Sequence, residues 1–244
     1  MSGQAWRLET TDRGRYCHLP ALTRLGLTHG FSCRDLGSGE AEESLACSLG
    51  LQEFPRARLR QQHTSTVHEV CTALVQTPPV GDALVAQQPG WALRLQTADC
   101  LPVLVLDTGK GHYGVVHAGW RGTVAGVLLQ TLSALRSGGA EPRSTWVAMG
   151  PGIRACCFEI GEEVVAAFAT RWPEETRRWL LSGSGTRQHL DLVAANRWQA
   201  LQAGVPANQV LDSGLCTRCR SDLFFSHRGD GGTTGRIITL AGRL

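Results

Sequence analysis

The sequence lacks the features that direct a chain into a membrane, out of the cell or onto nucleic acid. No apolar run approaches the ~20 residues that span a bilayer, and the first twenty residues lack the basic-then-apolar pattern of a signal peptide. The net charge is only +3, and the basic residues are scattered instead of forming a block. We therefore expect a cytoplasmic protein with neither a membrane nor a nucleic acid as partner.

Signatures of several enzyme classes are also missing. There is no H-x-H motif for a multicopper oxidase, no H-E-x-x-H for a zincin, no Walker A and no G-x-S-x-G elbow. The cytidine-deaminase pattern fails because Glu69 directly follows His68 and because Cys216 follows Leu215 instead of a proline. GKGHYG fits G-x-G-x-x-G, but a strand follows it, so we interpret it as a hairpin loop.

Cysteine, in contrast, is plentiful. Nine cysteines without a signal peptide argue against a disulfide framework, and most are expected to be small buried side chains. Cys216 and Cys219 have the spacing of a structural zinc site, which requires a second pair of the same kind. The adjacent Cys156 and Cys157 do not have that spacing, so a separate structural zinc site is not expected.

Apolar periodicity predicts strands and helices that interleave to the last residues. Strands are expected at 82–85, 90–96, 101–106, 114–116, 145–149, 208–211 and 235–240, and helices over 122–135 and 189–203. The segment GPGIRACCFEIGEE, from Gly150, is expected to open a further helix. The pattern predicts an α/β (α+β) fold with one domain over residues 1–244.

Candidate chemistry concentrates between Thr97 and Thr123. Cys100 precedes a buried strand, and His117 ends the next one, just before Arg121. The pair could be a nucleophile with its base, or two ligands of a catalytic zinc, which keeps three protein ligands and an open position. The third ligand would be His63 or His68, which five-residue spacing places on opposite faces of an expected strand. Both readings remain open on residue types alone.

Two segments could bind an anion. Arg34 follows a turn at Gly30, although the residues alone favour a solvated arginine there. The loop Gly150–Gly152 leads toward a helix N-terminus, where free N–H groups attract anions. Arg34 and Arg121 are the preferred phosphate candidates because guanidinium binds phosphate through two hydrogen bonds. Asp99 and Glu159 are candidate proton carriers, and Asp99 could equally be a strand-end cap.

Several separated motifs resemble one known family. They are THGFS.R from Thr28, TADCLPV (97–103), VHAGWRGT (116–123), GPGI..CCFEIGEEV (150–164), LDL..AN (190–196), CT (216–217) and FFS.R.D...TGR (224–236). In this order they resemble the YfiH-like "multicopper polyphenol oxidase (laccase)" family, whose relatives include a laccase-domain protein active on purine nucleosides. The resemblance covers nearly the whole chain.

The resemblance implies a compact fold with mixed sheets flanked by helices, similar to the catalytic domain of cytotoxic necrotising factor toxins. It implies one zinc ion per chain, held by His63, Cys100 and His117. It also implies purine nucleoside and phosphate as partners, with phosphorolysis of adenosine, inosine, guanosine or methylthioadenosine and deamination of adenosine. Copper (Cu²⁺) would replace zinc if the family's phenol-oxidase activity is real.

The resemblance also suggests site residues. The catalytic candidates are Cys100, His117, Asp99 and Arg121. The substrate-binding candidates are His29, Phe31, Arg34, Gly150, Cys156, Glu159 and Arg228. Three positions depart from the family pattern: Thr64 replaces a glycine, Ser48 stands in a segment that has lost an asparagine, and Gly229 replaces an arginine in a segment where His227 replaces a tyrosine.

Other functions stay open at this point. They are copper-dependent phenol oxidation, a metal-free thiol hydrolase using Cys100 and His117, editing of peptidoglycan precursors, and non-enzymatic binding of a nucleotide or cell-wall precursor. The protein is expected to be a monomer or a small homo-oligomer.

Overall fold

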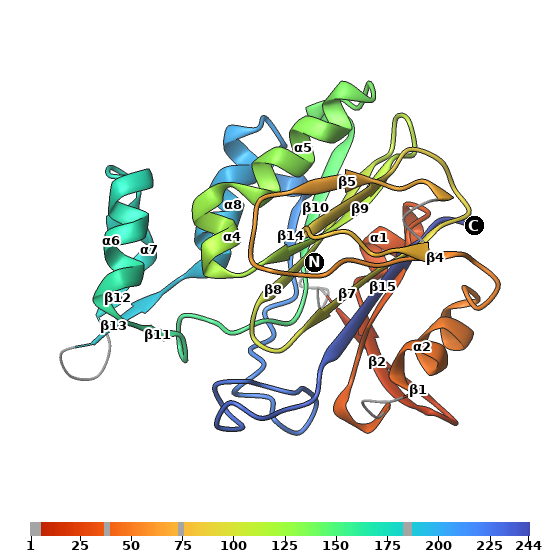
Figure 1. The fold of residues 1–244 in the computed structure, drawn as a ribbon, viewed down its shortest axis with the longest axis horizontal. Coiled ribbons are helices and arrows are strands. Elements are labelled where there is room, and N and C mark those ends of the chain that lie inside the picture. Colours follow the sequence, from red (N-terminus) through yellow and green to blue (C-terminus); the bar gives the residue numbers. More distant parts are fainter. Residues whose placement is uncertain (1–5, 37–39, 73–75, 183–186) are drawn as a thin grey trace.

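Two six-stranded sheets form the centre of the molecule in the computed structural model, which describes residues 6–36, 40–72, 76–182 and 187–244 (Figure 1). The first sheet has the order β1 (Arg7–Thr11), β2 (Gly14–His18), β3 (Thr28–Ser32), β15 (Ile237–Gly242), β7 (Ala92–Thr97), β4 (Arg56–Ala57). The second has the order β14 (Val210–Asp212), β10 (Thr145–Met149), β8 (Leu101–Asp107), β9 (Tyr113–Ala118), β6 (Ala83–Ala86), β5 (Val67–Glu69). Both sheets are mixed, with parallel pairs at β4/β7, β5/β6 and β10/β14.

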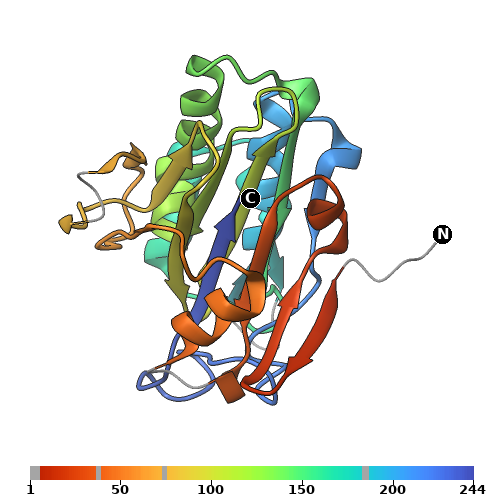
Figure 2. The ribbon, with the colours of Figure 1, turned by 90° about the vertical axis from the view of Figure 1, so that its right-hand side faces the viewer.

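The sheets pack face to face between two layers of helices. The helices are α1 (Pro20–Arg24), α2 (Ala41–Leu49), α4 (Trp120–Ala125), α5 (Val127–Ser137), α6 (Glu162–Arg171), α7 (Thr176–Trp179) and α8 (Leu192–Gln202), with 3₁₀ turns at Arg34–Leu36, Pro142–Ser144 and Ala207–Gln209. Figure 2 shows the sheet with the red N-terminal strands and blue β15 in front of the sheet with the green strands. The helix α2 covers the outer face of the first sheet, and α4, α5 and α8 cover that of the second.

The strand β8 explains why the sequence around it is an unbroken apolar run. Val103 and Val105 join the core under the helices, whereas Leu104 and Leu106 join the core between the two sheets. All seven residues of the strand are buried. A strand covered on both faces cannot alternate apolar with polar residues.

A smaller unit extends from the helical side of the second sheet (Figure 1). It contains α6, α7 and a three-stranded sheet of β11 (Glu159–Ile160), β13 (Gln188–Leu190) and β12 (Leu180–Ser182). Three tryptophans join it to α8: the Trp198 ring packs edge-on against Trp172 and Trp179, with centroids 5.0 and 5.5 Å apart. These contacts hold the unit against the main body.

The expected mixture of helices and strands is confirmed, and the strand over 145–149 is β10 itself. GKGHYG lies in the turn of the antiparallel β8–β9 hairpin, as predicted. The single helix predicted over 122–135 is wrong, because Gly126 adopts φ +79° and separates α4 from α5. Among the described residues, no helix combines the length and apolar character needed to cross a membrane.

Candidate metal centre

Three side chains from separate parts of the second sheet converge on one point. Cys100 precedes β8, His117 lies near the end of β9, and His63 comes from the loop before β5. The sulfur of Cys100 and the nearest ring nitrogens of the two histidines all lie within 4.8 Å of one another. The prediction that His63 and His68 share a strand is wrong: His63 is in a loop with φ +60°, and His68 instead hydrogen-bonds the Val80 carbonyl at 2.9 Å.

A buried carboxylate, Asp82, builds the loop that carries His63. It accepts backbone N–H bonds from His63 at 3.0 Å and from Thr64 at 2.6 Å, and the Thr64 hydroxyl adds a bond of 2.8 Å. A left-handed residue such as His63 needs this kind of support, because φ near +60° is disfavoured for side chains with a Cβ. Thr64, where the family pattern has glycine, therefore contributes a bond that glycine lacks.

The same carboxylate orients His117. Asp82 Oδ1 lies 2.7 Å from His117 Nδ1, so this nitrogen carries the proton and Nε2 faces the centre. Burial lowers the pKa of His117, but its bonds to Asp82 and Cys100 outweigh burial and raise it to about 9. Burial raises the pKa of the Asp82 carboxyl, but the bonds from His117 and Thr64 hold it well below its usual range.

The thiol of Cys100 has the character of a metal ligand. Burial raises its pKa, but hydrogen bonds and charge from His117 and His63 outweigh burial and lower it to about 6. Its sulfur lies 3.7 Å from His63 Nε2, close to the roughly 3.6 Å expected between sulfur and nitrogen ligands of one tetrahedral zinc. A Cβ on Gly119 would lie 2.9 Å from that sulfur, so the glycine permits the close approach. The donors fit a metal ion with an open fourth position.

A cleft with two lobes opens over these three residues. One lobe, of about 310 Å³, is lined by Gln61, Gln96, Arg236 and His227 together with the three ligands. The second, also about 310 Å³, is lined by Trp120, Arg121, Phe158 and Arg228 beside His63 and Cys100. The Arg121 guanidinium lies over the Trp120 ring at 4.2 Å. One side of the cleft thus offers aromatic faces and cations, which suit a planar ring and an anion.

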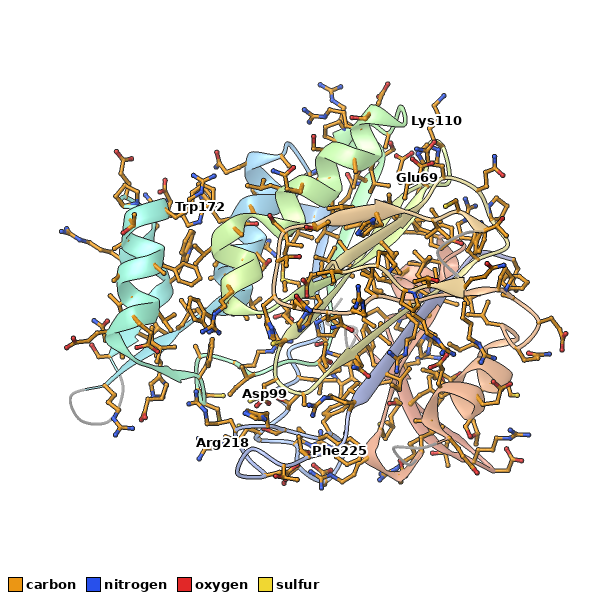
Figure 3. The ribbon with its side chains drawn as sticks, in the orientation of Figure 1. Glu69, Asp99, Lys110, Trp172, Arg218 and Phe225 are labelled. Atoms are coloured by element: carbon orange, nitrogen blue, oxygen red, sulfur yellow. The ribbon has the colours of Figure 1, made fainter. Side chains whose placement is uncertain are left out.

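The Asp99 carboxylate is occupied by hydrogen bonds. It accepts from the hydroxyls of Thr217 at 2.6 Å and Ser226 at 2.7 Å, and from the Arg228 backbone N–H at 2.7 Å. Figure 3 shows Asp99 beside the C-terminal segment that carries Arg218 and Phe225. Its φ is +89°, a strained value for a residue other than glycine. Asp99, which directly precedes Cys100 and also lines the second lobe of the cleft, therefore connects the backbone next to Cys100 to the C-terminal segment.

Three of the expected substrate-binding residues lie in the packed interior. His29 is buried, and both its nitrogens bond the backbone: Nε2 accepts from the Leu19 N–H and Nδ1 donates to the Leu27 carbonyl. Phe31 is buried between the sheets against Gly150, where a Cβ would lie 2.4 Å from the Phe31 ring. None of the three lines either lobe of the cleft.

The other residues expected to bind substrate or phosphate do not all lie at the cleft. Arg34 binds Asp230 at 2.8 Å and lies over the Phe225 ring, so it does not line the cleft. Glu159 is paired with Arg187. The Gly150–Gly152 loop does not lead into a helix N-terminus, because α6 begins only at Glu162. Arg121 and Arg228 remain beside the ligands, and Arg228 also donates to the Glu159 carbonyl at 2.9 Å.

Other residues of the cleft escaped the sequence reasoning. Asp82 carries no motif that would mark it, since a lone aspartate at the start of a strand is common. Arg236 belongs to the motif FFS.R.D...TGR and Trp120 to VHAGWRGT, so these motifs were the available signal for them. His227 stands at an unspecified position of its motif, where the family has tyrosine, and had no such signal. Cys156 lies apart from the three-ligand centre, close to three other cysteines.

Comparison with known proteins finds several relatives of this chain. A family model described as multi-copper polyphenol oxidoreductase laccase matches residues 35–243. The chain is 40% identical over 205 residues to a purine nucleoside phosphorylase of Deinococcus radiodurans, covering 83% of this chain and 76% of the relative. It is 39% identical over 158 residues to adenosine deaminase RL5 of an unknown prokaryotic organism, covering 65% of this chain and 60% of the relative. The matches span only about three fifths of several such relatives.

The fold has a close counterpart among solved structures. The crystal structure of the hypothetical protein YfiH of Bacillus licheniformis superimposes with a TM-score of 0.88 at 25% identity. The superposition covers 97% of this chain and 99% of the other. The mixed α+β architecture is therefore common to the two proteins.

Proposed function

This chain belongs to the multi-copper polyphenol oxidoreductase laccase family, and we propose that within it the chain is a zinc-dependent purine nucleoside enzyme. In one reaction, phosphate and adenosine, inosine, guanosine or methylthioadenosine give the free base and the sugar 1-phosphate. In the other, water and adenosine give inosine and ammonia. The proposal is carried by the convergence of His63, Cys100 and His117 in a cleft, and relatives bear the names of both activities.

The donor set favours one zinc ion at this centre. His63, Cys100 and His117 are the three ligands of a catalytic zinc site, and Asp82 fixes His117 so that Nε2 is the free donor. Bound there, a metal ion would supply Lewis-acid chemistry in the cleft. A metal ion needs a thiolate and neutral imidazoles as ligands. The lowered pKa of Cys100 favours the thiolate, whereas His117, whose pKa is raised, must release a proton when the ion binds.

Different side chains of the cleft would bind the purine, bind the phosphate and donate a proton. Trp120 and Phe158 offer apolar surface to the purine ring, and Arg121 with Arg228 offers positive charge to phosphate. In phosphorolysis a phosphate oxygen bonds the sugar C1′ while the glycosidic bond breaks, and its electron pair leaves with the purine. His227, which lines both lobes, is our candidate for the proton donor to that purine.

Phenol oxidation is the second candidate because two histidines and one cysteine are also the donors of a blue-copper site. An oxidase with several copper ions needs more imidazoles near that site. In the described part of the chain the only other ligand cluster contains four cysteines and no histidine. Zinc chemistry on nucleosides is therefore the better supported function.

A product assay tests the proposal. Purified protein is incubated with adenosine, with and without phosphate, and adenine, ribose 1-phosphate and inosine are measured. We expect adenine only with phosphate and inosine in both conditions. Cys100→Ala should abolish both products, whereas Cys71→Ser, at an exposed cysteine outside the cleft, should retain them.

Two results would contradict the proposal. The first is unchanged adenosine in both conditions for a protein that holds stoichiometric zinc. The second is a metal-free protein whose activity on another substrate is lost when Cys100 is alkylated, which would favour the thiol hydrolase. Colour and phenol oxidation that depend on copper loading would favour the oxidase.

A further inference from the structure

Four cysteines meet at a second point of the molecule, although two come from the loop after β10 and two from the segment after β14. Their sulfurs, in Cys156, Cys157, Cys216 and Cys219, all lie within 4.8 Å of one another. We call them the four-cysteine cluster. The spacing of Cys156 and Cys157 does not predict a zinc site with Cys216 and Cys219, but the fold brings the four residues together.

The distances inside this cluster suit one metal ion. The sulfur of Cys219 lies 3.6 Å from that of Cys156 and 3.4 Å from that of Cys157. A disulfide requires about 2.05 Å, whereas zinc–sulfur bonds of about 2.3 Å place tetrahedral ligands roughly 3.8 Å apart. An iron–sulfur cluster would need its cysteines spread around several iron and sulfide ions, and these four sulfurs lie too close together for that.

Backbone geometry holds the sulfurs in place from both sides. Cys216 and Cys219 lie in a tight turn closed by the Arg220 N–H to the Cys216 carbonyl at 3.0 Å. In the other segment the Cys157 N–H donates to the Arg154 carbonyl at 2.8 Å, which closes a second turn. The two turns fix the backbone that carries the four thiols.

The Arg154 side chain joins the two segments of the cluster. Its guanidinium donates to Asp212 at 2.7 Å, to the Leu215 carbonyl at 3.0 Å and to the Gly150 carbonyl at 2.9 Å. An isolated parallel bridge between Gly152 and Cys216 adds a direct backbone contact. The approach of the four sulfurs is therefore built into the fold and does not depend on flexible side chains alone.

We propose that Cys156, Cys157, Cys216 and Cys219 bind one structural zinc ion, separate from the centre at His63, Cys100 and His117. Binding releases the thiol protons to solvent and leaves zinc with four thiolates and no open position. Thr217, inside the turn, donates to Asp99, the residue before Cys100. The ion would thus hold the turn at Cys216–Cys219 in place, and through Thr217 and Asp99 it would stabilise the backbone next to Cys100. This role does not depend on which substrate binds in the cleft.

Metal analysis of the intact chain tests this site. Purified wild-type protein should contain two zinc ions per chain, and Cys219→Ser and Cys100→Ala should each contain one. Cys71→Ser is the matched control, since Cys71 is an exposed cysteine outside both ligand groups, and should keep two. X-ray absorption of Cys100→Ala should show zinc bound only to sulfur at about 2.3 Å.

A labelling measurement keeps the test valid if Cys219→Ser fails to fold. In native wild-type protein, an alkylating reagent should modify Cys71 and spare the exposed Cys156 and Cys219 until a chelator removes zinc. The proposal is overturned if Cys156 and Cys219 react as fast as Cys71, if either forms a disulfide, or if the ion is iron. A single zinc that Cys100→Ala removes and Cys219→Ser leaves would also overturn it, while leaving the proposed nucleoside function intact.

Discussion

At the scale of single residues, Asp82 positions two of the three candidate ligands, His63 and His117. Its one carboxylate bonds the backbone of the His63 loop and the ring of His117, which are 54 positions apart. Sequence motifs predicted the three residues that meet at the candidate metal centre, because these motifs are distinctive. They did not identify Asp82, because the role of a carboxylate behind a ligand depends on which loop folds over it.

Asp82→Asn should therefore weaken the centre without removing a ligand. An amide cannot accept all these bonds, and its NH₂ group would face the donors of Thr64 and His63. We expect zinc affinity to fall about 10- to 100-fold, the usual effect of losing a partner behind a metal ligand. Chelator competition measures this, with Asp12→Asn in an exposed turn as control. Unchanged affinity would mean that Asp82 serves only the loop.

His29 gives a prediction about pH. Burial lowers its pKa from 6.5 to about 4, with a smaller lowering from His18, and outweighs the bond to the Leu27 carbonyl, which raises the pKa. The unfolded chain therefore binds this proton at a higher pH than the folded chain does. The contribution of neutral His29 to stability is complete above pH 6.5 and is lost as the pH falls toward 4. The loss of stability should reach about 3 kcal/mol.

Urea unfolding between these pH values checks the prediction. His29→Gln keeps one acceptor and one donor but does not titrate, so its stability should fall less steeply with acid. Parallel curves for the two proteins would show that other groups cause the acid sensitivity. The part of the pH dependence of unfolding free energy that comes from other groups should be the same in wild type and variant.

At the scale of elements, periodicity located strands well and helix ends poorly. The strand over 145–149 was predicted to the residue because its apolar run is short and bounded by polar or glycine residues. The break between α4 and α5 was missed, since the apolar positions continue across Gly126 with helical spacing. A glycine in the left-handed conformation cannot be distinguished by periodicity from one inside a helix.

Gly126→Ala tests that break. A Cβ there would have ordinary contacts only, with Leu129 at 3.6 Å, so the cost is conformational. The left-handed conformation disfavours alanine by about 1–2 kcal/mol. We expect the free energy of unfolding, measured with urea, to fall by that amount, whereas Gln130→Ala on the exposed face of α5 should be nearly neutral. A stabilised Gly126→Ala would indicate that α4 and α5 can merge into one helix.

At the scale of the whole molecule, both proposed metal sites depend on contacts between distant segments. The three-ligand centre gathers residues 63, 100 and 117, and the four-cysteine cluster gathers 156 and 157 with 216 and 219. The sequence predicted the first set through family motifs and rejected the second on spacing. The spacing of residues in the sequence predicts ligands that lie in a single turn. It does not predict a site formed by two turns that the fold brings together.

Phe31 and Gly150 provide the test at this scale, because they join the two sheets. Both were expected to bind substrate, but Phe31, on β3, packs on the glycine after β10. Gly150→Ala would place a Cβ 2.4 Å from the ring, and overpacking of this kind costs about 1–3 kcal/mol. Phe31→Leu should relieve the clash, so the double variant should be more stable than Gly150→Ala alone.

A double-mutant cycle of unfolding free energies measures this coupling between the sheets. If the two residues act only on substrate, Gly150→Ala would leave stability unchanged and the single effects would add. Because the cleft lies at the end of the same sheets, a strained Gly150→Ala should also bind metal less tightly, and Phe31→Leu should restore that binding in part. Joint recovery of stability and metal affinity would show that the packing between the sheets positions the ligands.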